Sequence, residues 1–170
     1  QLAGNYSLVE GYNNLVAGEA SHGEGYSNKV TGAYAHVEGY DNEVSGRNAH
    51  AEGQRNKVYG IGAHADGLLN TANGDHSNAS GYDTDANGFS SHSEGYQTET
   101  NSAYSHAEGD TTSTIGIASH SEGKNTIANG YATHSEGIGT IAESDYSHPE
   151  GNGTVTTGIC SHSEGNKSRA

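Results

Sequence analysis

Small, polar and glycine residues follow one another along this chain in a pattern that repeats every 14 residues. In the register that starts at Tyr6, the third position is His in ten of twelve repeats, the fifth is Glu or Asp in eleven, and the sixth is Gly in all twelve. The pattern continues without insertion or deletion through eleven full repeats and a partial twelfth. Such strict self-similarity predicts a solenoid in which each repeat forms one coil.

Each repeat is too short for a helical hairpin and suits two short strands joined by two tight turns. We expect the first strand at positions two to five, as in residues 119–122, and the second at about positions nine to twelve, as in residues 42–45. A glycine able to adopt positive φ is expected at each turn, at positions six and thirteen. Parallel stacking at about 4.8 Å per coil gives a rise of roughly 55 Å. The sequence therefore predicts an all-β parallel β-roll, with residues 1–170 as a single repeat domain and a segment of a longer fibre.

Positions two, four, nine and eleven carry mostly Ala, Ser, Thr, Val and Asn, and the alternation predicts that they fill a narrow interior. The residues at position nine are expected to form hydrogen-bonding ladders, which comprise Asn14, Asn28, Asn42, Asn56 and Asn70, followed by Thr84 through Thr154. Two faces then point outward. Positions ten and twelve vary as ordinary solvent exposure allows, whereas positions three and five are nearly uniform.

The uniform face is predicted to lie where chains meet. An interior of such small residues removes little apolar area from water, so an isolated coil stack gains little stability. If three chains pack this face around a common axis, imidazoles and carboxylates of each layer can hydrogen-bond to one another. The predicted trimer-axis ladder consists of His22, Glu24, His36, Glu38, His50, Glu52, His64, Asp66, His92, Glu94, His106, Glu108, His120, Glu122, His134, Glu136, His148, Glu150, His162 and Glu164.

Composition narrows the function classes. The chain is 30% hydrophobic and carries a formal net charge of −14 with His neutral, which argues against nucleic acid and anionic membranes as partners. No apolar run is long enough to insert into a membrane. The one cysteine, Cys160, excludes an internal disulfide. We expect no enzyme, because no Ser–His–Asp constellation stands apart from the repeat.

The repeat resembles the head of trimeric autotransporter adhesins (YadA-like heads). The resemblance covers residues 6–168 and is clearest in residues 118–123, Ala-Ser-His-Ser-Glu-Gly, followed by residues 126–130, Thr-Ile-Ala-Asn-Gly. It implies a left-handed parallel β-roll, a homotrimer, and extracellular attachment to a host receptor or glycan. In that family Val and Ile face the trimer axis, whereas His and Glu occupy those positions here. Similar His-Ser-Glu-Gly arrays also look like parts of bacteriophage tail fibres and spikes, so the expected location is a cell surface or a virion tail.

Three interpretations of the ladder remain open at this stage: a structural polar seam, an ion site and a pH response. Stacked imidazoles can bind Zn²⁺ or Ni²⁺, or an anion when protonated, and we expect no other cofactor. Histidine also titrates near neutral pH, although the sequence does not give the direction of any effect. Asn78 and Ser80 replace the His/Glu pair in the sixth repeat.

A row of tyrosines follows the glycine at position six and is a second candidate surface. Because the repeat stacks them, we expect these rings to line one edge of the roll at stacking distance. Tyrosine offers an apolar ring and a polar hydroxyl, so the row suits a glycan or protein receptor, or the cover of a neighbouring subunit. Its members are Tyr12, Tyr26, Tyr40, Tyr82 and Tyr96.

Overall fold

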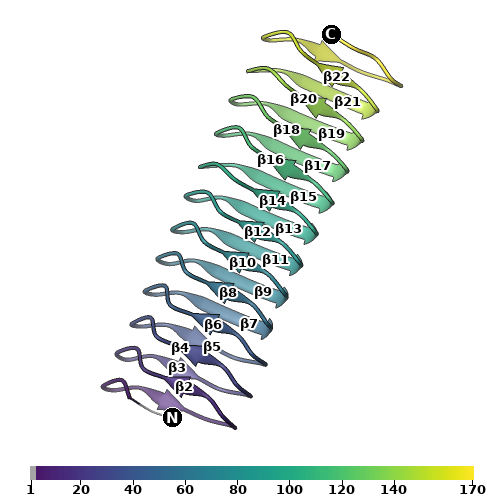
Figure 1. Cartoon of the computed structure of the whole chain (residues 1–170). Coiled ribbons are helices and arrows are strands. Elements are labelled where there is room, and N and C mark those ends of the chain that lie inside the picture. The colour runs from purple at the N-terminus through teal and green to yellow at the C-terminus, as the bar shows by residue number, and fades with distance from the viewer. Residues whose placement is uncertain (1–2) are drawn as a thin grey trace.

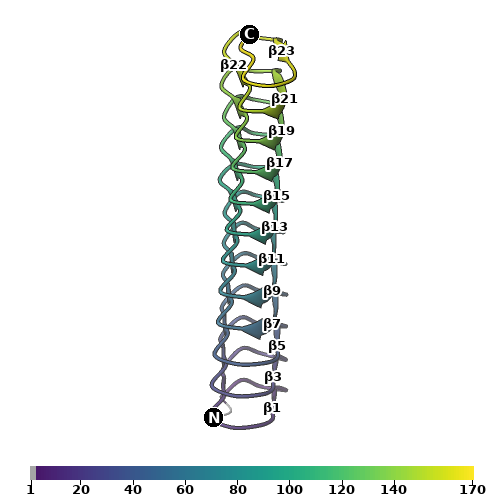
Figure 2. The ribbon, with the colours of Figure 1, turned by 90° about the vertical axis from the view of Figure 1, so that its right-hand side faces the viewer.

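The computed structural model describes residues 3–170 and consists of coils stacked into an elongated rod (Figure 1). Odd-numbered strands form a 12-stranded parallel sheet and even-numbered strands an 11-stranded parallel sheet. The two sheets run as thin facing layers along the whole rod (Figure 2). All the regular elements of residues 3–170 are strands, and no helix there is long and apolar enough to cross a membrane.

The first sheet lies along one side of the rod. It consists of β1 (Leu8–Val9), β3 (His22–Gly23), β5 (His36–Val37), β7 (His50–Gln54), β9 (His64–Leu68), β11 (Asn78–Tyr82), β13 (His92–Tyr96), β15 (His106–Asp110), β17 (His120–Lys124), β19 (His134–Ile138), β21 (His148–Asn152) and β23 (His162–Ser163).

The second sheet is made of two-residue strands on the other side. It consists of β2 (Leu15–Val16), β4 (Lys29–Val30), β6 (Glu43–Val44), β8 (Lys57–Val58), β10 (Thr71–Ala72), β12 (Asp85–Ala86), β14 (Glu99–Thr100), β16 (Ser113–Thr114), β18 (Ile127–Ala128), β20 (Ile141–Ala142) and β22 (Val155–Thr156).

The register of both sheets follows the repeat. Each residue pairs with the residue 14 positions later, so that His106 pairs with His120 and Glu108 with Glu122 between β15 and β17. The backbone N–H of His106 donates to the carbonyl of Ser119 at 2.9 Å, and equivalent bonds recur from coil to coil. Identical residue types therefore stack above one another. The predicted all-β parallel solenoid of 14-residue coils is confirmed.

The interior is filled by the predicted small residues. Val30 and Ala107 are fully buried, as are the asparagines at position nine from Asn28 onward. The Oδ1 atom of Asn14 accepts the backbone N–H of Asn28 at 2.8 Å, while Nδ2 of Asn28 donates to the carbonyls of Glu24 and Gly39 at 2.6 and 2.9 Å. The predicted asparagine ladder is confirmed, and it satisfies backbone groups that the sheet leaves free.

The threonines at position nine do not continue that ladder. Thr84 closes it, because its hydroxyl donates to Oδ1 of Asn70 at 2.9 Å. Where position four is a serine, the later hydroxyls bond to it across the interior, as Thr98 does to Ser93 at 2.7 Å and Thr126 to Ser121 at 2.7 Å. Thr154 instead donates to the carbonyl of Glu150 at 3.1 Å, and Thr112, which faces an alanine, has no hydrogen-bond partner among residues 3–170. A threonine side chain is too short to reach both the coil above and the carbonyls below, so it pairs within its own coil.

The strands lie near the predicted positions but with different bounds. The first strand of the ninth repeat runs from His120 to Lys124 rather than over residues 119–122, and the second strand of the third repeat covers only Glu43–Val44. Gly123 therefore lies inside β17, with a φ of 105°. A Cβ there would collide with the carbonyl oxygen of Gly137 in the next coil, so glycine is required for close stacking within the strand.

The predicted positive φ is confirmed for the glycines at position six, where it is 88–122°, and is wrong for those at position thirteen. The glycines at position thirteen, such as Gly32, do not have a left-handed φ; a Cβ there would instead collide with the carbonyl of Gly46 in the next coil. Positive φ also falls on positions one and eight, as at Asn48 with φ 56° and Asp41 with φ 57°. The residue at these two positions is seldom glycine; among the described coils only Gly62, Gly139 and Gly153 occupy them.

Candidate functional site: the His/Glu face

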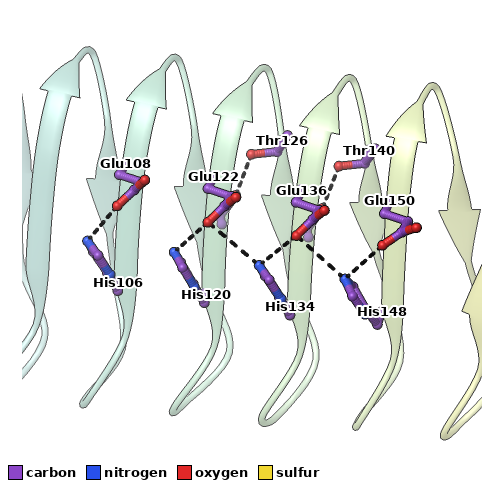
Figure 3. A network of polar contacts seen from close by, with 12 residues as sticks. His106, Glu108, His120, Glu122, Thr126, His134, Glu136, Thr140, His148 and Glu150 are labelled. Carbon is purple, nitrogen blue, oxygen red and sulfur yellow. Dashed lines mark hydrogen bonds and ion pairs between the residues drawn. The ribbon is translucent and has the colours of Figure 1, made fainter. Parts of the chain in front are cut away.

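The predicted ladder residues lie together on the outer surface of the first sheet. Each histidine begins a strand and the acid follows two residues later, so both point to the same side. Around His120 the flanking Ser119 and Ser121 are buried, which turns His120 and Glu122 away from the interior. Figure 3 shows these pairs on successive strands, together with the Ser–Thr bonds inside the roll. We call the surface made by positions three and five the His/Glu face.

The imidazole rings form two continuous stacks. One runs from His22 to His64 and the other from His92 to His162, with neighbouring ring centroids 4.7–5.0 Å apart and ring planes within 20° of parallel. The spacing equals the strand spacing of the sheet, so the backbone register alone sets it.

Carboxylates flank the imidazoles at 3.2 Å in the pair of His92 and Glu94 and at 3.5–3.9 Å in the other pairs. Oε2 of Glu122 lies 3.6 Å from Nε2 of His120 and 3.9 Å from Nε2 of His134. Glu136 repeats the arrangement, at 3.5 Å from His134 and 3.9 Å from His148. Each of these carboxylates therefore lies between the histidine of its own coil and that of the next.

The imidazole nitrogens are closed to solvent although the side chains are only partly covered. His120 and Glu122 keep 33% and 39% of their side-chain surface exposed. Seven Nε2 atoms nevertheless have almost no accessible surface and no hydrogen-bond partner within residues 3–170: those of His22, His50, His64, His106, His120, His134 and His148. A shielded polar atom without a partner is costly in a finished structure, so these atoms indicate a missing ligand or neighbour.

At three histidines of the face the surroundings favour neutral imidazole. Burial first, and the neighbouring histidines second, lower the pKa of His106 and His120 below the ordinary value of 6.5, while Glu108 and Glu122 oppose the shift. The pKa of His148 is lowered in the same way. Because the folded-state pKa lies below the unfolded one, the associated stability is present above pH 6.5 and is lost as the pH falls. This gives the direction that the sequence left open.

The sixth coil interrupts both rows. Asn78 takes the histidine position, and its Oδ1 atom is shielded without a hydrogen-bond partner among the described residues. The hydroxyl of Ser80 donates to Oδ2 of Asp66 at 3.1 Å. His76 lies outside the face, where its ring meets Phe89 edge-on at 5.8 Å.

Several groups on the His/Glu face bring three metal-ligand atoms within 4.8 Å of one another. Four sets combine two imidazole nitrogens with one carboxylate oxygen and the N-terminal set combines one imidazole with two carboxylates; zinc and its neighbours in the first transition row use such ligands. The sets are Glu10–His22–Glu24, His106–Glu108–His120, His120–Glu122–His134, His134–Glu136–His148 and His148–Glu150–His162.

The tyrosine row stacks as predicted, in two pieces. Tyr26 lies 5.3 Å from both Tyr12 and Tyr40, and Tyr82 lies 5.2 Å from Tyr96, with ring planes nearly parallel. The ring faces cover one another, so the row presents mainly ring edges and hydroxyls to its surroundings.

Two exposed features of the surface were not predicted from the sequence. A hollow on the second sheet is lined by Lys29, Lys57 and Arg55 together with acidic residues, and Lys29 donates to Glu43 there at 2.7 Å. The sequence does contain a signal for this hollow, because four of the seven basic residues lie between positions 29 and 57. The second feature is a row of exposed apolar side chains at the turn between coils: Ile61, Phe89, Tyr104, Ile117, Tyr131, Tyr146 and Ile159.

The comparisons with known proteins leave the chain without a family. No protein-family model matches it, and no curated protein is found to match it.

Proposed function

We propose that this chain is a segment of a non-enzymatic, homotrimeric fibre that attaches to surfaces outside the cell. In this proposal each chain is a left-handed β-roll, and three rolls place their His/Glu faces around a common axis. The observation that carries it is the contrast between the two outer surfaces of one rod. The His/Glu face repeats the same side chains, whereas positions ten and twelve range from Lys29 and Glu43 to Ile127 and Tyr59. A shared axis would constrain the side chains of one face and leave those of the other face free to vary.

The shielded Nε2 atoms support a position of the His/Glu face at the trimer axis. In one chain, Nε2 of His120 is already shielded and lacks a hydrogen-bond partner. Packing against two other chains would bring further carboxylates and imidazoles into reach, and would remove the remaining exposed third of each histidine from water. A polar seam satisfied in this way would replace the apolar core that the narrow roll lacks.

The attachment role is supported by the shape and by the absence of a unique chemical centre in the repeat. Coil after coil presents the same groups, whereas catalysis needs a few residues set apart in one place. The stacked tyrosines and the exposed apolar turns offer contacts for a glycan or protein receptor. An adhesin head on a bacterium and the shaft of a bacteriophage tail fibre are both compatible with this arrangement.

Sedimentation equilibrium of two charge-reversal variants tests the assembly. Glu122→Lys places three ammonium groups at the proposed axis, while Glu99→Lys makes the same change on the second sheet. The wild type and Glu99→Lys should sediment at three times the 17.5 kDa of one chain, and Glu122→Lys should dissociate. A wild type of 17.5 kDa, or equal dissociation of both variants, would overturn the proposal.

Binding of the labelled trimer to whole cells and to immobilised glycans tests the attachment role. The expected result is saturable binding that weakens in Tyr26→Ala. The absence of saturable binding to every surface would refute attachment while leaving the assembly result intact.

A further inference from the structure

The His/Glu face holds metal ligands that all come from one chain, and this inference goes beyond the proposed assembly. His120, Glu122 and His134 illustrate the arrangement: the carboxylate approaches both imidazoles, at 3.6 and 3.9 Å. The Nε2 atoms of both histidines are shielded and have no hydrogen-bond partner within residues 3–170. The ligand atoms thus converge on one small region and are not committed elsewhere in the chain.

The distances are close to those of a metal site. Zinc bonds to nitrogen and oxygen at about 2.0–2.2 Å, which places two ligand atoms of a tetrahedral site about 3.3 Å apart. The His–Glu separations within a coil approach this value, at 3.5 Å for His106–Glu108 and 3.6 Å for His120–Glu122. The ligand atoms of a set lie within 4.8 Å of one another, so the two imidazole nitrogens must approach each other by up to about 1.5 Å to share an ion. Rotation about the side-chain bonds of the two histidines provides such a movement.

The ligand chemistry matches divalent transition metals better than anions. A divalent metal binds the unprotonated nitrogen of a neutral imidazole, and each set supplies such nitrogens beside a carboxylate oxygen. The adjacent carboxylate offsets the positive charge of the ion. An anion would lie beside the carboxylate of Glu122, which is 3.6 Å from His120 and 3.9 Å from His134 and would repel it.

We propose that the His/Glu face binds Zn²⁺, or a related divalent transition metal, between successive coils through two histidines and the glutamate that lies between them. The N-terminal end uses the related set of Glu10, His22 and Glu24. Three protein ligands leave the fourth tetrahedral position to water or to a group from another chain.

The shared histidines limit how many ions one chain holds. The four C-terminal sets form a series in which His120, His134 and His148 each belong to two sets. Neighbouring sets cannot both be filled with three ligands each, so only two of the four are occupied together. With the N-terminal set, the capacity is at most three ions per chain.

This sharing makes two similar substitutions behave differently. His120→Asn removes the first two C-terminal sets and leaves two that compete for His148, so the chain loses one ion. His134→Asn removes the middle two sets and leaves the first and the last, which share no residue, so the capacity is unchanged. Asn78 already occupies the histidine position of the sixth coil, which shows that asparagine fits the fold there.

Titration of the metal-stripped protein with Zn²⁺ by calorimetry, and with Co²⁺ by visible absorption, tests the proposal. We expect three ions per chain in the wild type, in His134→Asn and in the off-face control His76→Asn, and two in His120→Asn. Co²⁺ should show the intense visible bands of a tetrahedral site. Circular dichroism of each variant confirms that it is folded.

Three outcomes would overturn the proposal: no binding by the wild type, equal loss in the two ladder variants, or equal loss in His76→Asn. If the trimer binds one ion per layer of three chains, and His120→Asn and His134→Asn lose the same number of ions, binding takes place at the trimer axis. Such a result would exclude sets within one chain. The sedimentation mass, measured on the same samples without metal, reports on the assembly separately.

Discussion

Ala107→Ser is predicted to stabilise the chain, because it supplies a partner to a buried hydroxyl. Ala107 is fully buried at position four, and Oγ1 of Thr112 across the interior is shielded without a hydrogen-bond partner among residues 3–170. In the coils on either side, a serine takes the position of Ala107 and bonds to the threonine of its coil. The Oγ–Oγ1 distance is 2.7 Å both for Ser93 and for Ser121.

The magnitude follows from these two neighbours. The new hydroxyl gains one hydrogen bond, worth about 0.5–1.5 kcal/mol net, and the same bond removes part of the penalty of leaving Thr112 unpaired. The added atom is accommodated in both adjacent coils, so overpacking is not expected. We expect the free energy of unfolding to rise by about 1–2 kcal/mol. For a chain of this length each kcal/mol shifts Tm by about 2–4 °C.

Ala65→Ser is the matched control at the same position of the fifth coil. Its partner across the interior is Asn70, whose Nδ2 already donates to the carbonyls of Asp66 and Gly81. Oδ1 of Asn70 already accepts two bonds from Thr84. The added hydroxyl would be buried without a partner, at a cost of about 1–3 kcal/mol.

Thermal and urea unfolding followed by circular dichroism measure both variants against the wild type. Ala107→Ser should raise the midpoint and Ala65→Ser should lower it, with unchanged transition slopes. A shift of the same sign in both would refute the pairing of positions four and nine as the source of interior stability.

Two further stability predictions concern the backbone and one surface acid. Gly109→Ala forces a Cβ against the carbonyl of Gly123 at a φ of 113°, so it should lower the free energy of unfolding by at least about 3 kcal/mol. Gly139→Ala has open space around it and a φ of 64°, so it should cost only about 1 kcal/mol. Equal urea midpoints for the two variants would contradict this reasoning. Burial raises the pKa of Asp85, helped by Glu99, so ionised Asp85 destabilises the fold. Asp85→Asn should therefore raise Tm at pH 7, and the gain should vanish below the unfolded-state pKa of 3.8; a gain that persists at pH 3 would exclude ionisation as its cause.

The repeat made the coil architecture predictable because a parallel solenoid stacks identical positions at a fixed spacing. Alternation then separated buried residues such as Val30 from the outward His36 and Glu38, and the structure places them accordingly. The asparagine ladder was predictable for the same reason, since equivalent side chains must lie one strand spacing apart.

Local backbone geometry was less predictable because two different constraints select glycine. Gly123 is needed inside a strand for its φ, while Gly32 avoids a collision without any left-handed φ. The sequence pattern shows both as an invariant or nearly invariant glycine and gives no means to separate them. Left-handed φ at Asn48 or Asp41 was hidden because the residue type there varies from coil to coil.

The orientation of the His/Glu face within an assembly is tested most directly by maleimide labelling of one introduced cysteine, in a Cys160→Ser background. Ser80→Cys places the thiol on the His/Glu face, and Ser113→Cys places it on the second sheet; both serines are partly buried in one chain. If three chains meet on the His/Glu face, the thiol at position 80 is labelled much more slowly than that at position 113, and dilution that dissociates the trimer removes the difference. Equal labelling rates at every concentration would contradict the account.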